Sequence, residues 1–410
     1  MAHVHSHGSA GPAAPRTTFL LVITLVSALL LTLVGVWLLW PNAADVPDRM
    51  PAKAEGTSFV DVTVTGPADP ATGSIPVELP GGEASRMQSP GPSVPLADGD
   101  RITAVDISQV SQPGVDPLVF MDYQRELPIA LLALAYAAVV LLVARWRGLA
   151  AMAGLGMAFV VLLGFTMPAL LAGESAIGVA LVTSSLVMFV TLYLAHGLSA
   201  RTSTALLGTL VGLGLTALLA AWASGAAQIT GATDEASAFL PSSAPGADLR
   251  GIALCGIVLA GMGVLNDVTI TQASAVWELR GVAPTASRAE LFTRAMRIGR
   301  DHIASTVYTI AFAYVGAALP LLMMVWLVDQ SPATALSSGE IAEEVVRTLV
   351  GSIGLVLAIP VTTAIATLTV PGPADATAGS TTAEPTSDPE LMAPVAEAWA
   401  SQRVPGTSAT

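Results

Sequence analysis

The stretch GMGVLNDVTITQASAVWELRG, from Gly261 to Gly281, combines the two features that decide the fold of this chain. It continues an apolar run that starts near residue 250, and about 20 apolar residues are enough for a helix to cross the hydrocarbon of a membrane. It also contains several polar side chains, which cost free energy in hydrocarbon unless they find partners or water. The helix predicted here therefore needs a protein or aqueous neighbour for its polar groups.

The composition of the 410-residue chain is typical of a membrane protein. Hydrophobic residues make up 53% of it, charged residues only 11%, and the mean hydropathy is +0.68. The charged fraction of a soluble domain is closer to about 25%. No basic patch suggests a nucleic-acid partner. The single cysteine, Cys255, excludes a disulfide framework and a cysteine metal site, and we expect no metal and no cofactor.

Apolar runs of sufficient length predict an all-α polytopic membrane protein with about eight transmembrane helices in the lipid bilayer. The first run is too long for the core of a signal peptide and lacks a convincing cleavage site, which indicates an uncleaved signal anchor. The eight predicted spans are residues 17–40, 127–144, 149–172, 175–195, 203–226, 250–277, 302–328 and 342–368.

The distribution of arginines predicts the orientation of the spans. The short loops on one side of the membrane carry most of the arginines, from Arg16 to Arg300. The short loops on the opposite side carry only Arg250 and Arg347. Positive loops stay in the cytoplasm, so both termini are predicted to be cytoplasmic. Arg outnumbers Lys sixteen to one, which fits a bacterial genome, and we expect a multi-pass protein of the bacterial cytoplasmic membrane.

The segment 41–126 is predicted to be an extracytoplasmic linker followed by a small β domain, a barrel or a sandwich. Alternation of apolar and polar residues between turn-forming residues is typical of strands. The alternating pieces are residues 58–65, 74–79, 101–107 and 117–123. An envelope protein is a candidate partner for this domain.

Both termini are predicted to be polar cytoplasmic segments that flank a seven-helix membrane domain at 127–370. The arm 1–16 holds His3, His5 and His7, a tract that either binds a metal weakly or stays unoccupied. The tail 371–410 is acidic and rich in Pro, Ser and Thr, which predicts disorder.

Helical angles gather the small and polar residues of the sixth span on one face. That face comprises Gly256, Gly263, Asp267, Thr271, Ser274 and Glu278. The opposite side carries Val258, Leu265 and Val276, and we expect that side to face lipid. Thr269 and Gln272 lie off the polar face.

Small residues recur at helical spacing in the fifth, seventh and eighth spans, where they let helices approach closely. We therefore expect the polar faces of spans six to eight to enclose a packed core. The residues assigned to helix packing are Gly208, Gly212, Gly256, Gly263, Gly316, Gly351 and Gly354.

Asp267 is the most informative single residue, because it lies about ten residues, or about 15 Å, from the predicted cytoplasmic end of its helix. A carboxylate at that depth needs a cation, a water-filled cavity or hydrogen-bond donors. Two interpretations stay open: a bond between helices, or an ion- or proton-binding group on a permeation path. The hypothetical path comprises Asp267, Thr271, Ser274, Glu278, Arg300, Asp301, His302, Thr306 and Thr309.

The sequence TASRAELFTRAMRIGRD, residues 285–301, predicts an interfacial amphipathic helix that begins with a capping box at Ser287 and Glu290. We hypothesise that Glu278 pairs with Arg297 or Arg300 near this boundary. Glu343 and Arg347, four residues apart, are spaced for an ion pair. Pro168, Pro320 and Pro360 are expected to kink or end their helices.

Four stretches resemble the YibE/F-like family of bacterial multi-pass membrane proteins. They are MDYQRELPIALLALAYAAVVLLVARWRGLAAMAGL (121–155), GMGVLNDVTITQASAVWEL (261–279), MRIGRDHIASTVYTIAFAYVGAALPLL (296–322) and EIAEEVVRTLVGSIGLVLAIPVTTAIA (340–366). The resemblance implies an integral cytoplasmic-membrane protein with an outer N-terminal domain. Family members usually carry Asn where this chain has Tyr308 and Gly where it has Ser305.

Two classes of function follow from these features. The first is a transporter or channel for an ion or small solute, with Asp267 on the path. The second is an envelope scaffold or assembly protein, whose polar helix faces serve packing only. We expect no enzyme, because the chain has no G-x-S-x-G, GxGD or Walker A string.

Overall fold

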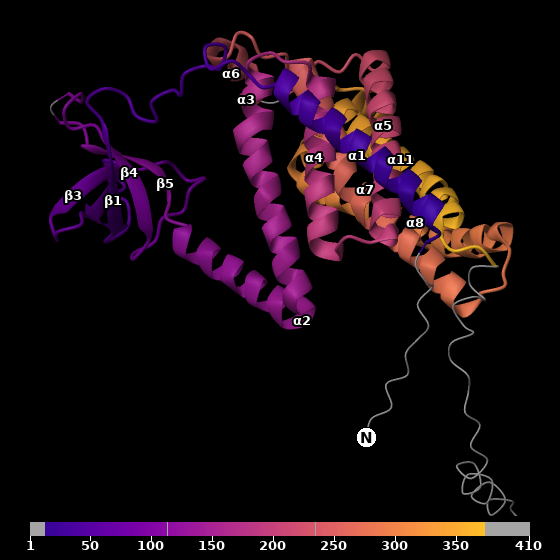
Figure 1. The fold of residues 1–410 in the computed structure, drawn as a ribbon. Coiled ribbons are helices and arrows are strands. Elements are labelled where there is room, and N and C mark those ends of the chain that lie inside the picture. The colour runs from indigo at the N-terminus through magenta and orange to yellow at the C-terminus, as the bar shows by residue number, and fades with distance from the viewer. Residues whose placement is uncertain (1–12, 113, 234, 374–410) are drawn as a thin grey trace, which may run out of the picture. The chain divides into compact units, whose positions relative to one another are not determined.

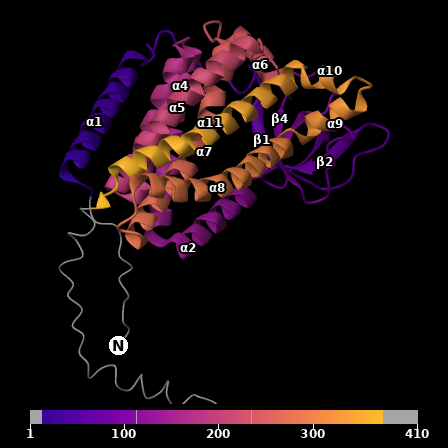
Figure 2. The ribbon, with the colours of Figure 1, turned by 90° about the vertical axis from the view of Figure 1, so that its right-hand side faces the viewer.

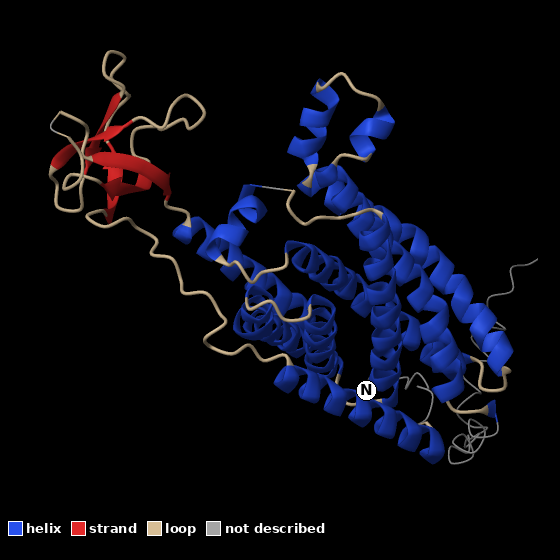
Figure 3. Ribbon diagram, turned by 90° about the horizontal axis from the view of Figure 1, so that it is seen from above, coloured by secondary structure: helices blue, strands red, loops and turns tan. Residues whose placement is uncertain are grey.

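The computed structural model describes residues 13–112, 114–233 and 235–373, which are helical apart from one β barrel (Figures 1 and 3). The predicted histidine arm and the predicted acidic tail lie outside the described residues, except for residues 13–16 and 371–373. The helices are α1 (Pro15–Leu38), α2 (Glu126–Val161), η1 (Leu162–Thr166, a π-helix), α3 (Met167–Leu171), α4 (Ala176–His196), α5 (Ala200–Ala226), α6 (Glu235–Ser243), α7 (Leu249–Val282), α8 (Arg288–Ala317), α9 (Leu319–Leu327), α10 (Pro332–Leu336) and α11 (Gly339–Thr369).

The chain divides into two compact units. The first unit contains the beginning of α1, α5, α7 from Gly256 onward, and α8 to α11. The second unit contains the end of α1, the barrel, α2 to α4, α6 and the first turns of α7. Every residue of the predicted path belongs to the first unit.

Six described helices are long and apolar enough to cross a membrane, namely α1, α2 with its continuation to Leu171, α4, α5, α7 and α11. The pair α8 and α9 passes the same test only jointly, because it bends by 68°, and raises the number to at most seven. Pro320, in the first turn of α9, follows this bend, as expected of a proline that ends a helix. A membrane protein is therefore supported, whereas eight crossings remain a prediction.

The number of membrane-crossing helices differs from the predicted eight because of α2. The helical stretch from Glu126 to Leu171 has 46 residues, or about 69 Å if straight, which is more than twice the thickness of the hydrocarbon. Its backbone breaks at Arg145, with φ 53° and ψ −132°, between the two spans predicted at 127–144 and 149–172 (Figure 1). The stretch is therefore two helices that meet at a kink at Arg145, and the count of six treats them as one.

Five strands form a closed barrel in the order β1-β2-β3-β5-β4, in which β3 and β5 are parallel. The strands are β1 (Ser58–Val64), β2 (Ser74–Glu78), β3 (Ala84–Gln88), β4 (Arg101–Asp106) and β5 (Leu118–Tyr123). Val64, Met87 and Ile102 are fully buried in its core. Alternation predicts four of these strands, but β3 was missed because its sequence, ASRMQ, has no β-branched residue.

Close packing in the first unit centres on α11, which lies against α5 and α8 (Figure 2). Gly208 faces Thr362, and a Cβ atom at Gly212 would lie 3.1 Å from Ala358. Gly354 similarly faces Thr216. These close approaches are what the predicted packing role of Gly208, Gly212 and Gly354 requires.

The other four glycines assigned to packing are not constrained in this way. A Cβ atom added at any of them would meet nothing within 4 Å among the described residues. These residues are Gly256, Gly263, Gly316 and Gly351. Their packing role stays a prediction, although Gly351 is buried and its Cα atom would lie 3.9 Å from a Cβ atom added at Gly261 of α7.

The side-chain amide of Gln272 joins three helices of the first unit. Its Nε2 atom donates to the backbone oxygen of Ala295 on α8, at 2.9 Å, and to the hydroxyl of Thr363 on α11, at 2.8 Å. Gln272 is only 2% exposed. Gly299 makes room for it, because a Cβ atom there would lie 2.7 Å from Ile359 and 3.1 Å from the amide oxygen.

Replacing Gly299 by alanine is expected to lower the free energy of unfolding by about 1–3 kcal/mol, because the new methyl group overlaps Ile359 and the Gln272 amide. Gly316→Ala on the same helix is the matched control, since space is open there; its effect should stay within about 1 kcal/mol. Unfolding of both variants in mixed micelles measures the difference. Equal stability of the two variants would contradict this packing.

Replacing Gln272 by leucine is expected to cost about 1–3 kcal/mol, because Thr363 and the Ala295 carbonyl lose a shared donor. The neighbouring Thr271→Val serves as control, since Thr271 is exposed and bonds only to the backbone of its own helix. If Gln272→Leu and Thr363→Val were additive in a double-mutant cycle, the proposed hydrogen bond between them would be absent.

Candidate functional site: the polar face of α7 and α8

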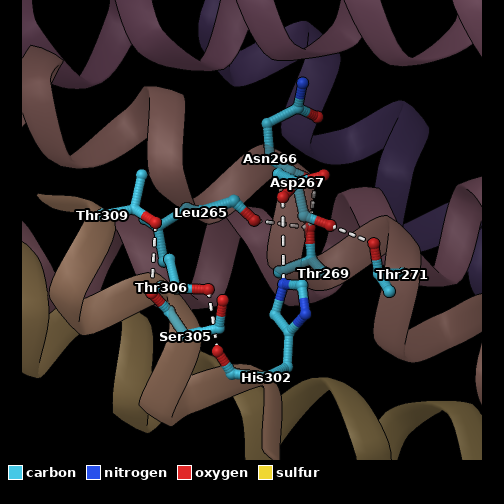
Figure 4. Close-up of polar contacts among 9 residues, drawn as sticks. All are labelled: Leu265, Asn266, Asp267, Thr269, Thr271, His302, Ser305, Thr306 and Thr309. Atoms are coloured by element: carbon cyan, nitrogen blue, oxygen red, sulfur yellow. Dashed lines mark hydrogen bonds and ion pairs between the residues drawn. The ribbon is translucent and has the colours of Figure 1, made fainter.

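Asp267 and His302 lie opposite each other on α7 and α8. His302 Nε2 is 3.8 Å from Asp267 Oδ2, and the two side chains point toward each other (Figure 4). The Asp267 side chain is 73% exposed and that of His302 is 32% exposed. Nε2 itself is buried and has no hydrogen-bond partner among the described residues. The carboxylate therefore remains available to another ligand.

The sequence placed His302 at the cytoplasmic boundary and Asp267 near the middle of the membrane, but the structure sets them at one level. The reason is that α8 is a single helix from Arg288 to Ala317, so its amphipathic first half runs on into the apolar half. Because Gln272 bonds to Ala295, that charged half lies alongside the end of α7. The pair thus marks the point where charged α8 gives way to apolar α8.

The polar face of α7 is turned the opposite way from the prediction. Gly263, Asp267, Thr271 and Glu278 are exposed, and Ser274 is half-buried. The side expected to face lipid is instead buried in the protein and includes Val258, Leu265 and Val276, each 0% exposed.

The reversal has a physical reason. The buried side includes Thr269 and Gln272, two neutral polar groups whose hydrogen bonds are completed inside the unit; the hydroxyls of Thr269 and Thr209 are 2.6 Å apart. A charged carboxylate such as Asp267 is far more costly to bury than a paired amide or hydroxyl. The helical periodicity correctly grouped the residues, but it could not tell which group is inside.

Three threonines near Asp267 and His302 each donate their hydroxyl proton to a backbone oxygen of their own helix. The hydroxyl of Thr271 donates to the backbone oxygen of Asp267, that of Thr306 to His302 and that of Thr309 to Ser305, at 2.7, 2.9 and 3.1 Å (Figure 4). A hydroxyl that donates to its own helix still has lone pairs that can accept. The face therefore presents acceptor oxygens around a carboxylate, an arrangement that suits a cation.

The remaining predicted path residues lie in the charged half of the two helices. The hypothesis that Glu278 pairs with Arg297 or Arg300 was wrong. Its ion-pair partner is Arg201 of α5, whose Nη1 atom is 4.0 Å from Oε1 of Glu278. Sequence reasoning missed Arg201 because it comes from a distant helix. Arg300 and Asp301 are exposed and have no ion pair within the described part of the chain.

Two local predictions concern α8 and α11. Half of the predicted capping box is present, because Ser287 accepts a hydrogen bond from the backbone of Glu290, at 3.2 Å, whereas the Glu290 carboxylate binds Arg294. The predicted pair of Glu343 and Arg347 on α11 is present at 2.9 Å, and Glu344 also binds Arg347, at 2.8 Å.

No group of three or more metal-binding side chains is close enough to hold a metal within the described residues.

Comparison with known proteins identifies the membrane part of the chain. The family model described as YibE/F-like protein matches residues 132–372, from α2 through α11, and this is more than half of the chain. The barrel lies before the matched region. Searches of curated proteins and of solved structures found no match. The chain therefore belongs to the YibE/F-like family.

Proposed function

We propose that this protein is a transporter or channel for an ion or small solute, and that its solute is a cation which binds first at Asp267. The observation that carries the proposal is the exposed Asp267 carboxylate beside His302, at the edge of the apolar half of α8. Ionisable groups at such positions of membrane proteins commonly belong to ion pathways.

The chemistry of the surrounding face favours a cation over an anion. Asp267 contributes a negative charge, and Thr271, Thr306 and Thr309 offer hydroxyl oxygens whose protons are bonded to backbone. Rings of such oxygens replace the hydration shell of cations in selective pores. His302 completes the face with an imidazole whose Nε2 atom is 3.8 Å from the carboxylate.

The proposed location is the bacterial cytoplasmic membrane, with both termini inside. The arginine distribution supports this orientation, and it puts the charged half of α8 at the cytoplasmic surface. The barrel then lies outside, where an envelope protein is a candidate partner. In this arrangement the solute meets Asp267 from the cytoplasmic side.

A scaffold or assembly role is the competing proposal. It draws support from the glycine and threonine contacts that join α5, α7 and α11, which serve packing alone. A scaffold, however, gives no reason for an exposed carboxylate at the polar edge of a membrane helix. Transport therefore accounts for more of the structure.

Flux measurements in proteoliposomes test the proposal. Purified protein should carry at least one of protons, Na⁺ or K⁺, and Asp267→Asn should reduce the initial rate about tenfold or more, since the amide keeps the shape of the side chain but removes its charge. His302→Gln should also reduce the rate. Asp329→Asn, an exposed aspartate in the loop after α9, is the matched control and should leave the rate unchanged.

Two results would decide against transport by this path. Unchanged flux in Asp267→Asn would remove Asp267 from the path. No flux of any tested cation, together with a stable partner crosslinked to the barrel, would instead support the scaffold.

A further inference from the structure

The β barrel carries a polar cleft on its outer surface, over β1 and its two neighbours β2 and β4. The cleft has a volume of about 320 Å³, near the lower end of the range for small-molecule sites. Its polar lining residues are Asp61, Thr63, Glu78, Arg101 and Gln124. The cleft belongs to the second unit, whereas every residue of the proposed ion path belongs to the first.

The pairing of the strands places the charged side chains of the cleft on the outer face of the barrel. Directly opposite residues of antiparallel strands project to the same side of a sheet, and Thr63 of β1 is opposite both Glu78 of β2 and Arg101 of β4. Their neighbours along the strands include Val64 and Ile102, which are buried inside the barrel. Glu78, Thr63 and Arg101 therefore form one row on the outside.

The two ends of this row carry opposite charges that do not pair with each other. Cβ atoms of directly opposite residues are about 5 Å apart, so about 10 Å separates those of Glu78 and Arg101. Both side chains are exposed, and neither has an ion pair or a hydrogen bond in the described part of the chain. Asp61, on the same side of β1 as Thr63, adds a second carboxylate, which accepts a hydrogen bond from Thr103, at 3.1 Å. The cleft thus offers both signs of charge to a ligand.

The arrangement of charges defines the class of ligand. A simple anion meets two carboxylates and a simple cation meets a guanidinium, whereas a zwitterion with separated charges satisfies both. An extended peptide spans about 3.3–3.6 Å per residue, so the ammonium and the carboxylate of a tripeptide are about 10 Å apart. The Thr63 hydroxyl and the Gln124 amide can each donate and accept hydrogen bonds, as the peptide groups between these ends require.

We propose that this cleft binds a short zwitterionic peptide of about three residues, with its ammonium at Asp61 and Glu78 and its carboxylate at Arg101. Charge-assisted hydrogen bonds of this kind are about twice as strong as neutral ones, and a guanidinium binds a carboxylate through two parallel bonds. The peptide reaches the cleft from water, because all three charged residues are exposed. Binding here does not depend on transport, since the cleft shares no residue with the proposed ion path.

Calorimetric titration of trialanine into the full-length protein in nanodiscs tests this site, with empty nanodiscs as the background. Saturable binding is expected that weakens as salt is added, because salt screens exposed charges. Glu78→Gln and Arg101→Gln should each weaken binding about three- to tenfold, since each removes one charged partner. Glu83→Gln and Arg86→Gln, at exposed charged residues of the barrel outside the cleft, are the matched controls and should bind as the parent protein does.

Capped peptides assign each end of the ligand to its partner. N-acetyl trialanine lacks the ammonium, so it should bind more weakly than trialanine and be insensitive to Glu78→Gln. Trialanine amide lacks the carboxylate, so its weaker binding should be insensitive to Arg101→Gln. Asp267→Asn should leave trialanine binding unchanged, which separates this site from the proposed transport path.

Three outcomes would overturn the site. They are absence of saturable trialanine binding, equal affinity for trialanine and for a tripeptide capped at both ends, and control variants that weaken binding as much as Glu78→Gln and Arg101→Gln do.

Discussion

The first unit depends on one buried amide, that of Gln272, which fixes how three of its helices meet. A polar group inside a membrane helix must be paired, and Gln272 donates both of its amide protons, one to α8 and one to α11. These bonds determine the register of α8 against α7, since Ala295 and Gly299 must lie at the amide. Once that register is set, His302 comes opposite Asp267.

The same rule explains which polar residues of α7 are inside. Neutral groups whose bonds can all be completed are buried, as with Thr269 and Gln272, whereas Asp267 and Glu278 stay exposed. Burying an amide with two acceptors costs little, but burying a carboxylate without a close cation costs several kcal/mol, on the order of 3–5. The carboxylates of α7 therefore lie apart from its paired neutral groups, whereas Arg280 is a buried charge, 1% exposed, that donates to the backbone oxygens of Pro284 and Ala286.

Much of this structure could be predicted from the sequence, and the predictions that failed share one cause. Periodicity located the membrane helices, four of five strands, the cap at Ser287 and the pair of Glu343 and Arg347, because each depends on neighbours along the chain. It failed for the buried side of α7 and the partner of Glu278, which depend on contacts between distant helices. Recognition of the family succeeded because it rests on the order of motifs and needs no three-dimensional contact.

The depth of Asp267 shows how length and contact together correct a sequence estimate. The 34 residues of α7 extend about 51 Å, and the hydrocarbon takes up only about 30 Å of that. The contacts with α8 show which end projects, since the arginines of α8 lie beside the last turns of α7 and cannot be in hydrocarbon. Asp267, whose side chain is 73% exposed, then lies where α8 changes from charged to apolar. In the proposed transporter, a carboxylate at this place would raise the local concentration of cations.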